Sequence, residues 1–139
     1  MSSFQIFDIA GSGMSAESVR LNTVASNLAN ADSVSSDPNS VYRAKHPVFQ
    51  AVLDSGPDSD PATASVEVTG IAESQAAPAS RYDPGNPLAD AQGYVYAPSV
   101  NVVEEMTDMI SASRSYQNNV EVLNTARDMM LDTLKLGQS

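Results

Sequence analysis

The chain has 139 residues and a formal net charge of -10, and it contains no cysteine, no tryptophan and only three phenylalanines. This length suffices for one domain, and the few large aromatic side chains predict a thin hydrophobic core. The negative charge argues against nucleic acid as a partner, because phosphates select basic surfaces. It also argues against binding to an anionic membrane surface. Without cysteine, no disulfide and no thiolate site can form.

Both ends of the chain are helical in pattern and free of proline, since all eight prolines lie between Pro38 and Pro98. We therefore expect three segments: a helical one over 1–31, a turn-rich one with short strands over 32–100, and a second helical one over 101–139. The expected fold class is mainly α, with long N- and C-terminal helices paired as a coiled coil and a small irregular/β segment between them.

The N-terminal helix is predicted from Ser3 to Ala31 because apolar residues recur every seven positions. They are Phe7, Met14, Leu21 and Leu28, with Ala10, Val24 and Ala31 at companion positions. Gly11 and Gly13 each cost about 1 kcal/mol relative to alanine inside a helix. A kink or a frayed first turn is therefore expected near them.

Asparagine is frequent at the end of this helix, in the sequence LNTVASNLAN (21–30). Asn22, Ser26 and Asn30 share one helical face, with Asn27 beside them. Because asparagine is a mediocre helix former, this cluster has two interpretations. It forms a polar, solvent-exposed face near a fraying end, or its amides bond across a helix–helix or subunit contact and fix the register.

The first half of the middle segment predicts short strands. VYRAKHPVFQAVLD (41–54) holds one or two of them, interrupted at Pro47, with His46 expected in an exposed loop. SGPDSDPATA (55–64) is expected to be a variable tip. SVEVTGIAES (65–74) alternates most clearly and is the strongest strand candidate, and Gly70 in it marks a possible bulge.

The second half of the middle segment begins with QAAPAS (75–80), which is expected to be a linker. Pro84 and Gly85 suit the central positions of a tight turn. A short aromatic strand is predicted in GYVY (93–96). Together these patterns indicate a small antiparallel sheet or a pair of hairpins without a core of its own.

The longest helix is predicted between Asn101 and Gly137. Asn101 suits the N-cap, Glu104 stands where a capping box requires it, and Gly137 is a stop. Its expected coiled-coil seam consists of Val102, Met106, Met109, Tyr116, Val120, Leu123, Met130 and Leu134. A helix of this length measures about 50 Å. A chain of this size cannot bury such a helix alone, so it needs a partner.

The middle of this helix is small and polar, at Ser111, Ala112, Ser113 and Ser115. One interpretation is a solvated turn. The other, which we adopt as a hypothesis, is close helix approach, where the size of the side chain limits packing.

No catalytic, metal or cofactor site is expected. His46 is the only histidine and lacks both a serine elbow and a second imidazole for a transition metal. Gly11 and Gly13 do not belong to a phosphate-binding loop, because no strand precedes them and no Gly-Lys-Ser/Thr follows. No run of eighteen apolar residues could span a bilayer, and the start of the sequence lacks the pattern of a cleaved signal peptide.

Two segments carry a family resemblance. LNTVASNLANAD (21–32) resembles the N-terminal signature of bacterial flagellar axial proteins. RYDPGNPLADAQGYVYAPSVNVVEEMTDMISASRSYQNNVEVLNTARDMMLDTLKLGQ (81–138) is more specific, and it is similar to the proximal rod proteins of the FlgC family within the flagellar basal-body rod proteins. The similarity weakens over 41–80, and Ser99 stands where the family commonly has asparagine. The polar residues of these motifs are Asn22, Asn27, Asn30, Asn101, Arg114, Gln117 and Asn119.

The resemblance implies a structural subunit of the rod, the drive shaft of the flagellar basal body. It implies export through the flagellar type III apparatus without a cleaved signal, assembly in the periplasm, and no cofactor or enzymatic activity. The implied partners are further copies of the chain, other proximal and distal rod subunits, the rod-to-membrane-ring adaptor and the export apparatus. Residues expected at helix pairing and subunit interfaces are Phe7, Met14, Leu21, Val24, Leu28, Val102, Met106, Met109, Ser113, Tyr116, Val120, Leu123, Met130 and Leu134.

Three alternatives stay open at this stage. A self-contained helical adaptor or chaperone would fold as a stable monomer. A needle-like subunit of another secretion system would be a closer relative of the rod hypothesis, but such subunits lack the segment from Tyr82 to Tyr96. An unrecognised enzyme would need a deep pocket with perturbed titratable groups.

Overall fold

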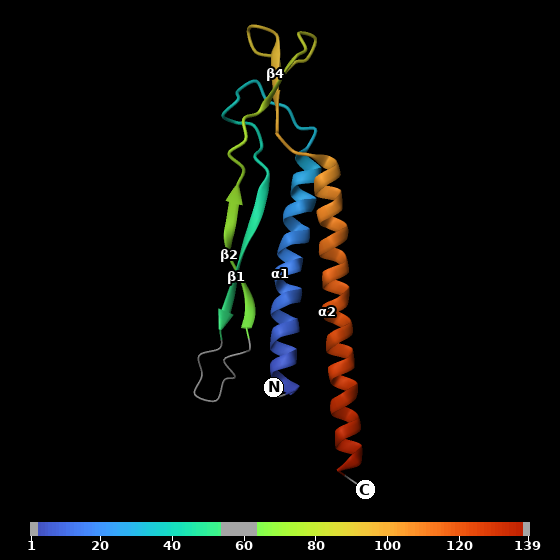
Figure 1. Ribbon diagram of the computed structural model, residues 1–139. Helices are drawn as coiled ribbons and strands as arrows, with labels where there is room; N and C mark the ends of the chain where they lie inside the picture. The colour runs from blue at the N-terminus through green and yellow to red at the C-terminus, as the bar shows by residue number, and fades with distance from the viewer. Residues whose placement is uncertain (1–2, 54–63, 138–139) are drawn as a thin grey trace.

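The structure is a computed structural model that describes residues 3–53 and 64–137. It is an elongated molecule of two long helices and two antiparallel hairpins (Figure 1). In chain order the elements are α1 (Ser3–Asn30), β1 (Lys45–Leu53), β2 (Ala64–Glu73), β3 (Ala79–Tyr82), β4 (Tyr94–Ala97) and α2 (Val102–Leu136). Most of the predicted variable tip, together with Asp54, lies outside the described residues.

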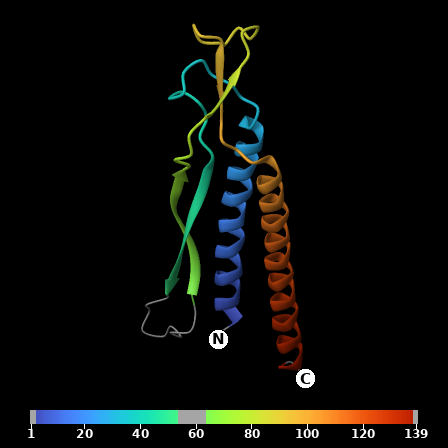
Figure 2. The ribbon, with the colours of Figure 1, turned by 45° about the horizontal axis from the view of Figure 1, so that its top comes forward.

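The two helices lie side by side and run in opposite directions, so the end of α1 is next to the start of α2 (Figures 1 and 2). The last turns of α2 extend past the start of α1. The β1–β2 hairpin lies along α1, and the β3–β4 hairpin stands at the end of the molecule where α2 begins. None of the described helices is apolar enough over a sufficient length to cross a membrane.

Helix α1 runs without interruption through Gly11 and Gly13, so the predicted kink or frayed first turn is wrong. The physical reason is clearest at Gly13. A Cβ atom added there would lie 2.8 Å from Nδ2 of Asn119 on α2. The missing side chain lets Asn119 approach the backbone of α1, and this packing outweighs the weak helix propensity of glycine.

Helix α2 begins and ends where the sequence predicts. The side chain of Asn101 accepts hydrogen bonds from the backbone N–H groups of Val103 and Glu104, which confirms the N-cap. Gly137 closes the helix and donates its backbone N–H to the carbonyl oxygen of Thr133 at 3.1 Å. The helix has 35 residues and is therefore about 52 Å long.

The face of α2 that meets α1 differs from the predicted stripe. Glu105, Ala112 and Ala126 are the buried residues of α2, and Asn119 occupies the same position of the seven-residue repeat. Side chains at Val102, Met106, Val120 and Leu134, which the sequence placed in the seam, are more than a third exposed. Alanine and asparagine in the contact let the two backbones approach closely, and the larger apolar side chains then remain on the outside.

The β1–β2 hairpin confirms the strand over 65–74 and the bulge near Gly70. Val48 pairs with Gly70 and Phe49 with Val68, so Thr69 has no partner in the register. Within 41–54, where one or two short strands were predicted, Lys45–Leu53 forms a single strand of nine residues.

Pro47 does not interrupt β1, contrary to the prediction. Both backbone polar groups of Lys45 bond to a side chain of α1, so they point away from β2. Pro47 lies two residues further along the strand and has the same orientation. Its missing N–H therefore removes no bond of the ladder. His46 is exposed as expected, but it lies in β1 and not in a loop.

The β3–β4 hairpin confirms the aromatic strand and the tight turn. The backbone N–H of Asn86 donates to the carbonyl of Asp83 at 3.1 Å, which places Pro84 and Gly85 at the centre of the turn. The predicted linker over 75–80 is wrong at its end, because β3 begins at Ala79 and pairs with β4. A strand of four residues is too short for its alternating pattern to be detected in a sequence. Val95 of β4 is fully buried.

Candidate functional site: the polar junction and the exposed faces of the helix pair

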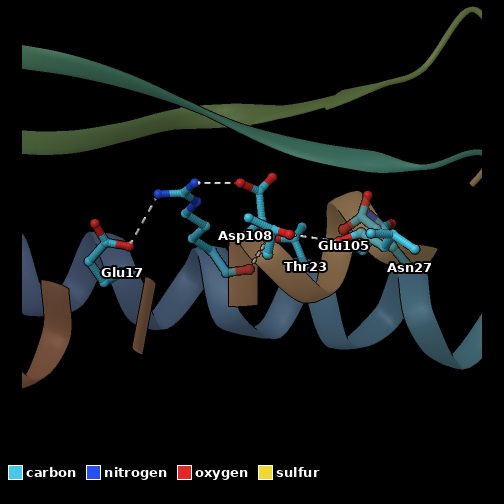
Figure 3. A network of polar contacts seen from close by, with 8 residues as sticks. Glu17, Thr23, Asn27, Glu105 and Asp108 are labelled. Carbon is cyan, nitrogen blue, oxygen red and sulfur yellow. Dashed lines mark hydrogen bonds and ion pairs between the residues drawn. The ribbon is translucent and has the colours of Figure 1, made fainter. Parts of the chain in front are cut away.

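Asn27, near the end of α1, is fully buried and forms the centre of a polar junction. Its Nδ2 donates to the carbonyl of Lys45 at 2.9 Å and to Oε1 of Glu105 at 3.0 Å. Its Oδ1 accepts from the backbone N–H of Lys45 at 2.8 Å and from the hydroxyl of Tyr42 at 2.9 Å. These bonds use the two donors and two acceptor positions of the amide. One side chain thus joins α1, α2 and the start of β1 (Figure 3).

A second polar link lies about two turns towards the start of α1. Nη2 of Arg20 donates to Oδ1 of Asp108 on α2 at 2.9 Å, and Nη1 lies 3.8 Å from Oε2 of Glu17 (Figure 3). Between the two links, the buried hydroxyl of Thr23 donates to the carbonyl of Val19 at 2.6 Å within its own helix. These two polar contacts therefore fix the register of α1 relative to the first turns of α2.

Each of the two interpretations holds for part of the asparagine cluster. Asn27 bonds across the helix–helix contact, whereas Asn22 is exposed. Asn30 donates to the carbonyl of Ser26 within α1 at 2.8 Å. Nothing in the sequence indicated that Tyr42 and Glu105 would complete the junction. A glutamate is common in the first turns of a helix because the helix dipole favours negative charge there. Its presence at position 105 therefore does not indicate that its side chain is buried.

The predicted interface residues occupy three environments. Val24 is buried. The half-buried residues are Phe7, Met14, Leu21, Leu28, Met109, Ser113, Leu123 and Met130, and the exposed residues are Val102, Met106, Tyr116, Val120 and Leu134. Among the signature polar residues, Asn27 is buried, Asn30 and Asn119 are half-buried, and Asn22, Asn101, Arg114 and Gln117 are exposed.

Helix α2 exposes large apolar side chains near both of its ends. Near the start they are Val102, Val103, Met106 and Ile110, and near the end they are Met129, Leu131, Leu134 and Leu136. Val103 and Leu136 reach exposures of 73% and 76%. Between these ends, exposed polar residues such as Arg114, Gln117 and Asn124 lie among the exposed apolar residues Tyr116, Val120 and Val122. A helix with two uncovered apolar ends needs contacts that one chain does not supply.

The β3–β4 tip, which we define as residues 79–97, is held by Asp90. Its Oδ1 accepts from the backbone N–H groups of Gln92 at 2.8 Å and Tyr94 at 2.9 Å. The bond from Tyr94 is the main reason that the pKa of the Asp90 carboxyl lies below its ordinary value of 3.8. The rings of Tyr82 and Tyr94 meet edge to face, with 5.2 Å between centroids. The tip is therefore a rigid element.

No group of three or more histidine or acidic side chains suited to a metal ion occurs within residues 3–53 and 64–137. The polar clusters that the structure does contain are hydrogen-bonded links between elements. Their chemistry is that of structural support, and the exposed surfaces are those of a protein that assembles.

Comparisons with known proteins agree with this description. Residues 7–35 match the family described as flagella basal body rod protein, and residues 91–136 match the flagellar basal body rod FlgEFG protein C-terminal family. The chain is 57% identical over 138 residues to the flagellar basal-body rod protein FlgC of Salmonella typhimurium, covering 99% of this chain and 100% of that protein. It is 54% identical over 138 residues to the protein of the same name from Yersinia enterocolitica, with the same coverage. It is 42% identical over 137 residues to that of Aquifex aeolicus, covering 97% of each. The chain therefore belongs to the flagellar basal-body rod protein FlgC family and is a structural subunit of the rod of the flagellar basal body.

Proposed function

We propose that this rod subunit polymerises through the outer faces of its two terminal helices. The observation that carries the proposal is the exposed apolar surface at both ends of α2. Each large apolar side chain that becomes fully buried contributes about 1.5–3 kcal/mol. Contacts with several neighbours would therefore supply much of the stability that the thin core of one chain lacks. The residues engaged would be Val102, Met106, Tyr116, Val120 and Leu134, together with Val103 and Ile110.

Within each subunit, we propose that α1 and α2 act as an antiparallel coiled coil. Glu105, Ala112, Asn119 and Ala126 repeat every seven residues along the contact, which is the spacing of such a seam. A buried polar residue in a seam fixes its register, and Asn27 is placed to do so. The close approach at Gly13 favours small residues in this seam.

We further propose the route and the place of assembly. Export through the flagellar type III apparatus suits a chain whose helices order fully only when neighbours cover them, because ordering on binding lets a segment travel unfolded. Assembly would take place in the periplasm, with other proximal and distal rod subunits and the rod-to-membrane-ring adaptor as neighbours. In this scheme the segments 1–31 and 101–139 form the axial unit, 32–100 packs outward, and the chain has no catalytic role.

The test is a charge placed on the apolar outer face of α2. Ile110→Glu puts a carboxylate where a neighbour would bury an apolar side chain, so we expect loss of motility in a complementation assay and loss of the subunit from isolated basal bodies. Asn124→Glu adds the same charge two heptads along on the same side and serves as the matched control. Full motility of the Ile110→Glu strain at normal protein level would refute the proposal.

A further inference from the structure

A groove with an apolar floor lies between the start of α1 and the second half of α2. Four apolar residues line it together with three polar ones: Ile6, Val122, Ala126 and Met129, and Asn118, Glu121 and Thr125. The groove has a volume of about 410 Å³. Its residues come from both helices, so it exists only when α1 and α2 are paired. A site of this kind fits an aromatic side chain with a positively charged neighbour.

The β3–β4 tip carries such a pair of residues at the other end of the molecule. Tyr82 is 64% exposed, the largest fraction among the aromatic residues whose exposure the structure describes. Arg81 precedes it, with a side chain that is 64% exposed and only a loose contact to Asp83 at 3.6 Å. The bonds of Asp90 and the edge contact with Tyr94 hold the tip in one conformation. A rigid aromatic anchor loses little conformational freedom when it binds.

We infer that the β3–β4 tip of one subunit docks into this groove of a second copy, with Tyr82 on the apolar floor and Arg81 beside Glu121. The inference rests on the proposed polymerisation and names one of its contacts. The groove is lined by the start of α1 and the second half of α2. These segments lie towards the opposite end of the elongated molecule from the β3–β4 hairpin (Figures 1 and 2), so the tip and the groove cannot meet within one chain. A contact between two different surfaces is heterologous, and when it does not close on itself it extends the assembly along one direction.

Local charge complementarity, rather than net charge, favours a second copy as the occupant. The chain has only 7 basic residues against 17 acidic ones, so two copies repel each other unless opposite charges meet locally. Arg81 stands at the exposed tip, and Glu121 stands at the groove. An aromatic residue in a desolvated pocket, with a charged pair at its edge, is also the usual composition of a binding hot spot.

A charge exchange tests the contact on the purified full-length protein by sedimentation velocity over a concentration series. Arg81→Glu and Glu121→Arg should each weaken self-association by about tenfold or more, because like charges then face each other. The double variant R81E/E121R keeps the net charge of -10 and should regain association to within about threefold of the unaltered chain. Arg127→Glu is the matched control, since Arg127 is 68% exposed and also lies near an aspartate.

Disulfide cross-linking gives a second, independent result, because the chain has no native cysteine. R81C/E121C should form covalent oligomers on oxidation, whereas R127C/E121C should not. Three outcomes would overturn the inference: equal effects of R81E and R127E, no recovery in the double variant, or a chain that stays monomeric and uncross-linked at every concentration. The proposed polymerisation is judged separately, by the Ile110→Glu strain, so failure of the tip contact can be told apart from failure of polymerisation.

Discussion

Asn27 of α1 and Glu105 of α2 are 78 positions apart in the sequence and are joined by a buried hydrogen bond of 3.0 Å. Both side chains are at most 5% exposed. Sliding one helix along the other by a turn would separate them and leave two buried polar groups without partners, at a cost of about 1–3 kcal/mol each. The pair therefore selects one register of the two helices, and the same amide holds β1 in place through Lys45.

Asn27→Ala should lower the free energy of unfolding by about 2–4 kcal/mol, because Glu105 and the backbone of Lys45 lose their amide partner in the interior. Tyr42 keeps its hydrogen bond to Ser26. Urea unfolding followed by circular dichroism measures this change. Asn22→Ala, on the exposed side of the same helix, should change the value by less than about 0.5 kcal/mol. Equal effects of the two substitutions would show that the junction is not what holds the elements together.

The two glycines of α1 should respond differently to alanine. A Cβ at Gly11 would meet open space, so Gly11→Ala should stabilise the protein by about 0.5–1 kcal/mol through helix propensity. A Cβ at Gly13 would lie 2.8 Å from Nδ2 of Asn119, so Gly13→Ala should gain less or lose stability. Adding Asn119→Ala to Gly13→Ala should restore the gain. A Gly13→Ala protein as stable as the Gly11→Ala protein would contradict the close contact.

The elements that follow from local sequence were predicted well. The helix limits at Asn101 and Gly137, the turn at Pro84 and the bulge near Gly70 each depend on the residues at that place. The face of α2 that meets α1 was predicted less well. An apolar stripe reports which residues avoid water, and it does not say whether the same chain or a neighbour covers them.

The polar junction could not be predicted from the sequence, because its members are brought together only by the fold. Asn27 was singled out as a register residue, but its partners come from two other segments, 42–45 and the first turns of α2. Lys45 takes part through its backbone, which carries no information about residue type. Pro47 was misjudged because its place at the outer edge of a two-stranded hairpin depends on that pairing.

Stability should depend on pH through Asp90. The pKa of this carboxyl is lower in the folded chain than its ordinary value of 3.8, chiefly because it accepts the backbone N–H of Tyr94. The contribution of the carboxylate to the free energy of unfolding is thus present above pH 3.8, and it is lost as the pH falls through the lower pKa of the folded chain. Acid unfolding should therefore show a steeper loss of stability below pH 3.8 for the unaltered chain than for Asp90→Asn. Parallel curves for the two proteins would contradict this assignment.

Small side chains in the middle of α2 should be required for assembly. Ser113 is half-buried beside the fully buried Ala112, whereas Ser111 is exposed. Ser113→Leu should abolish motility by blocking close helix approach, since overpacking a tight contact costs about 1–3 kcal/mol. Ser111→Leu adds the same side chain at the exposed position and should be tolerated better. Normal swimming of a Ser113→Leu strain would refute the requirement.

Neighbouring subunits should complete the order of the helix pair. Far-UV circular dichroism and sedimentation velocity, recorded together on the purified full-length protein over a concentration series, test it most directly. The dilute monomer should have less helix than the 28 residues of α1 and 35 of α2, and its helix content should rise as the protein associates. A monomer that is fully helical, unfolds cooperatively on heating and does not associate at any concentration would contradict the claim and favour a self-contained helical adaptor.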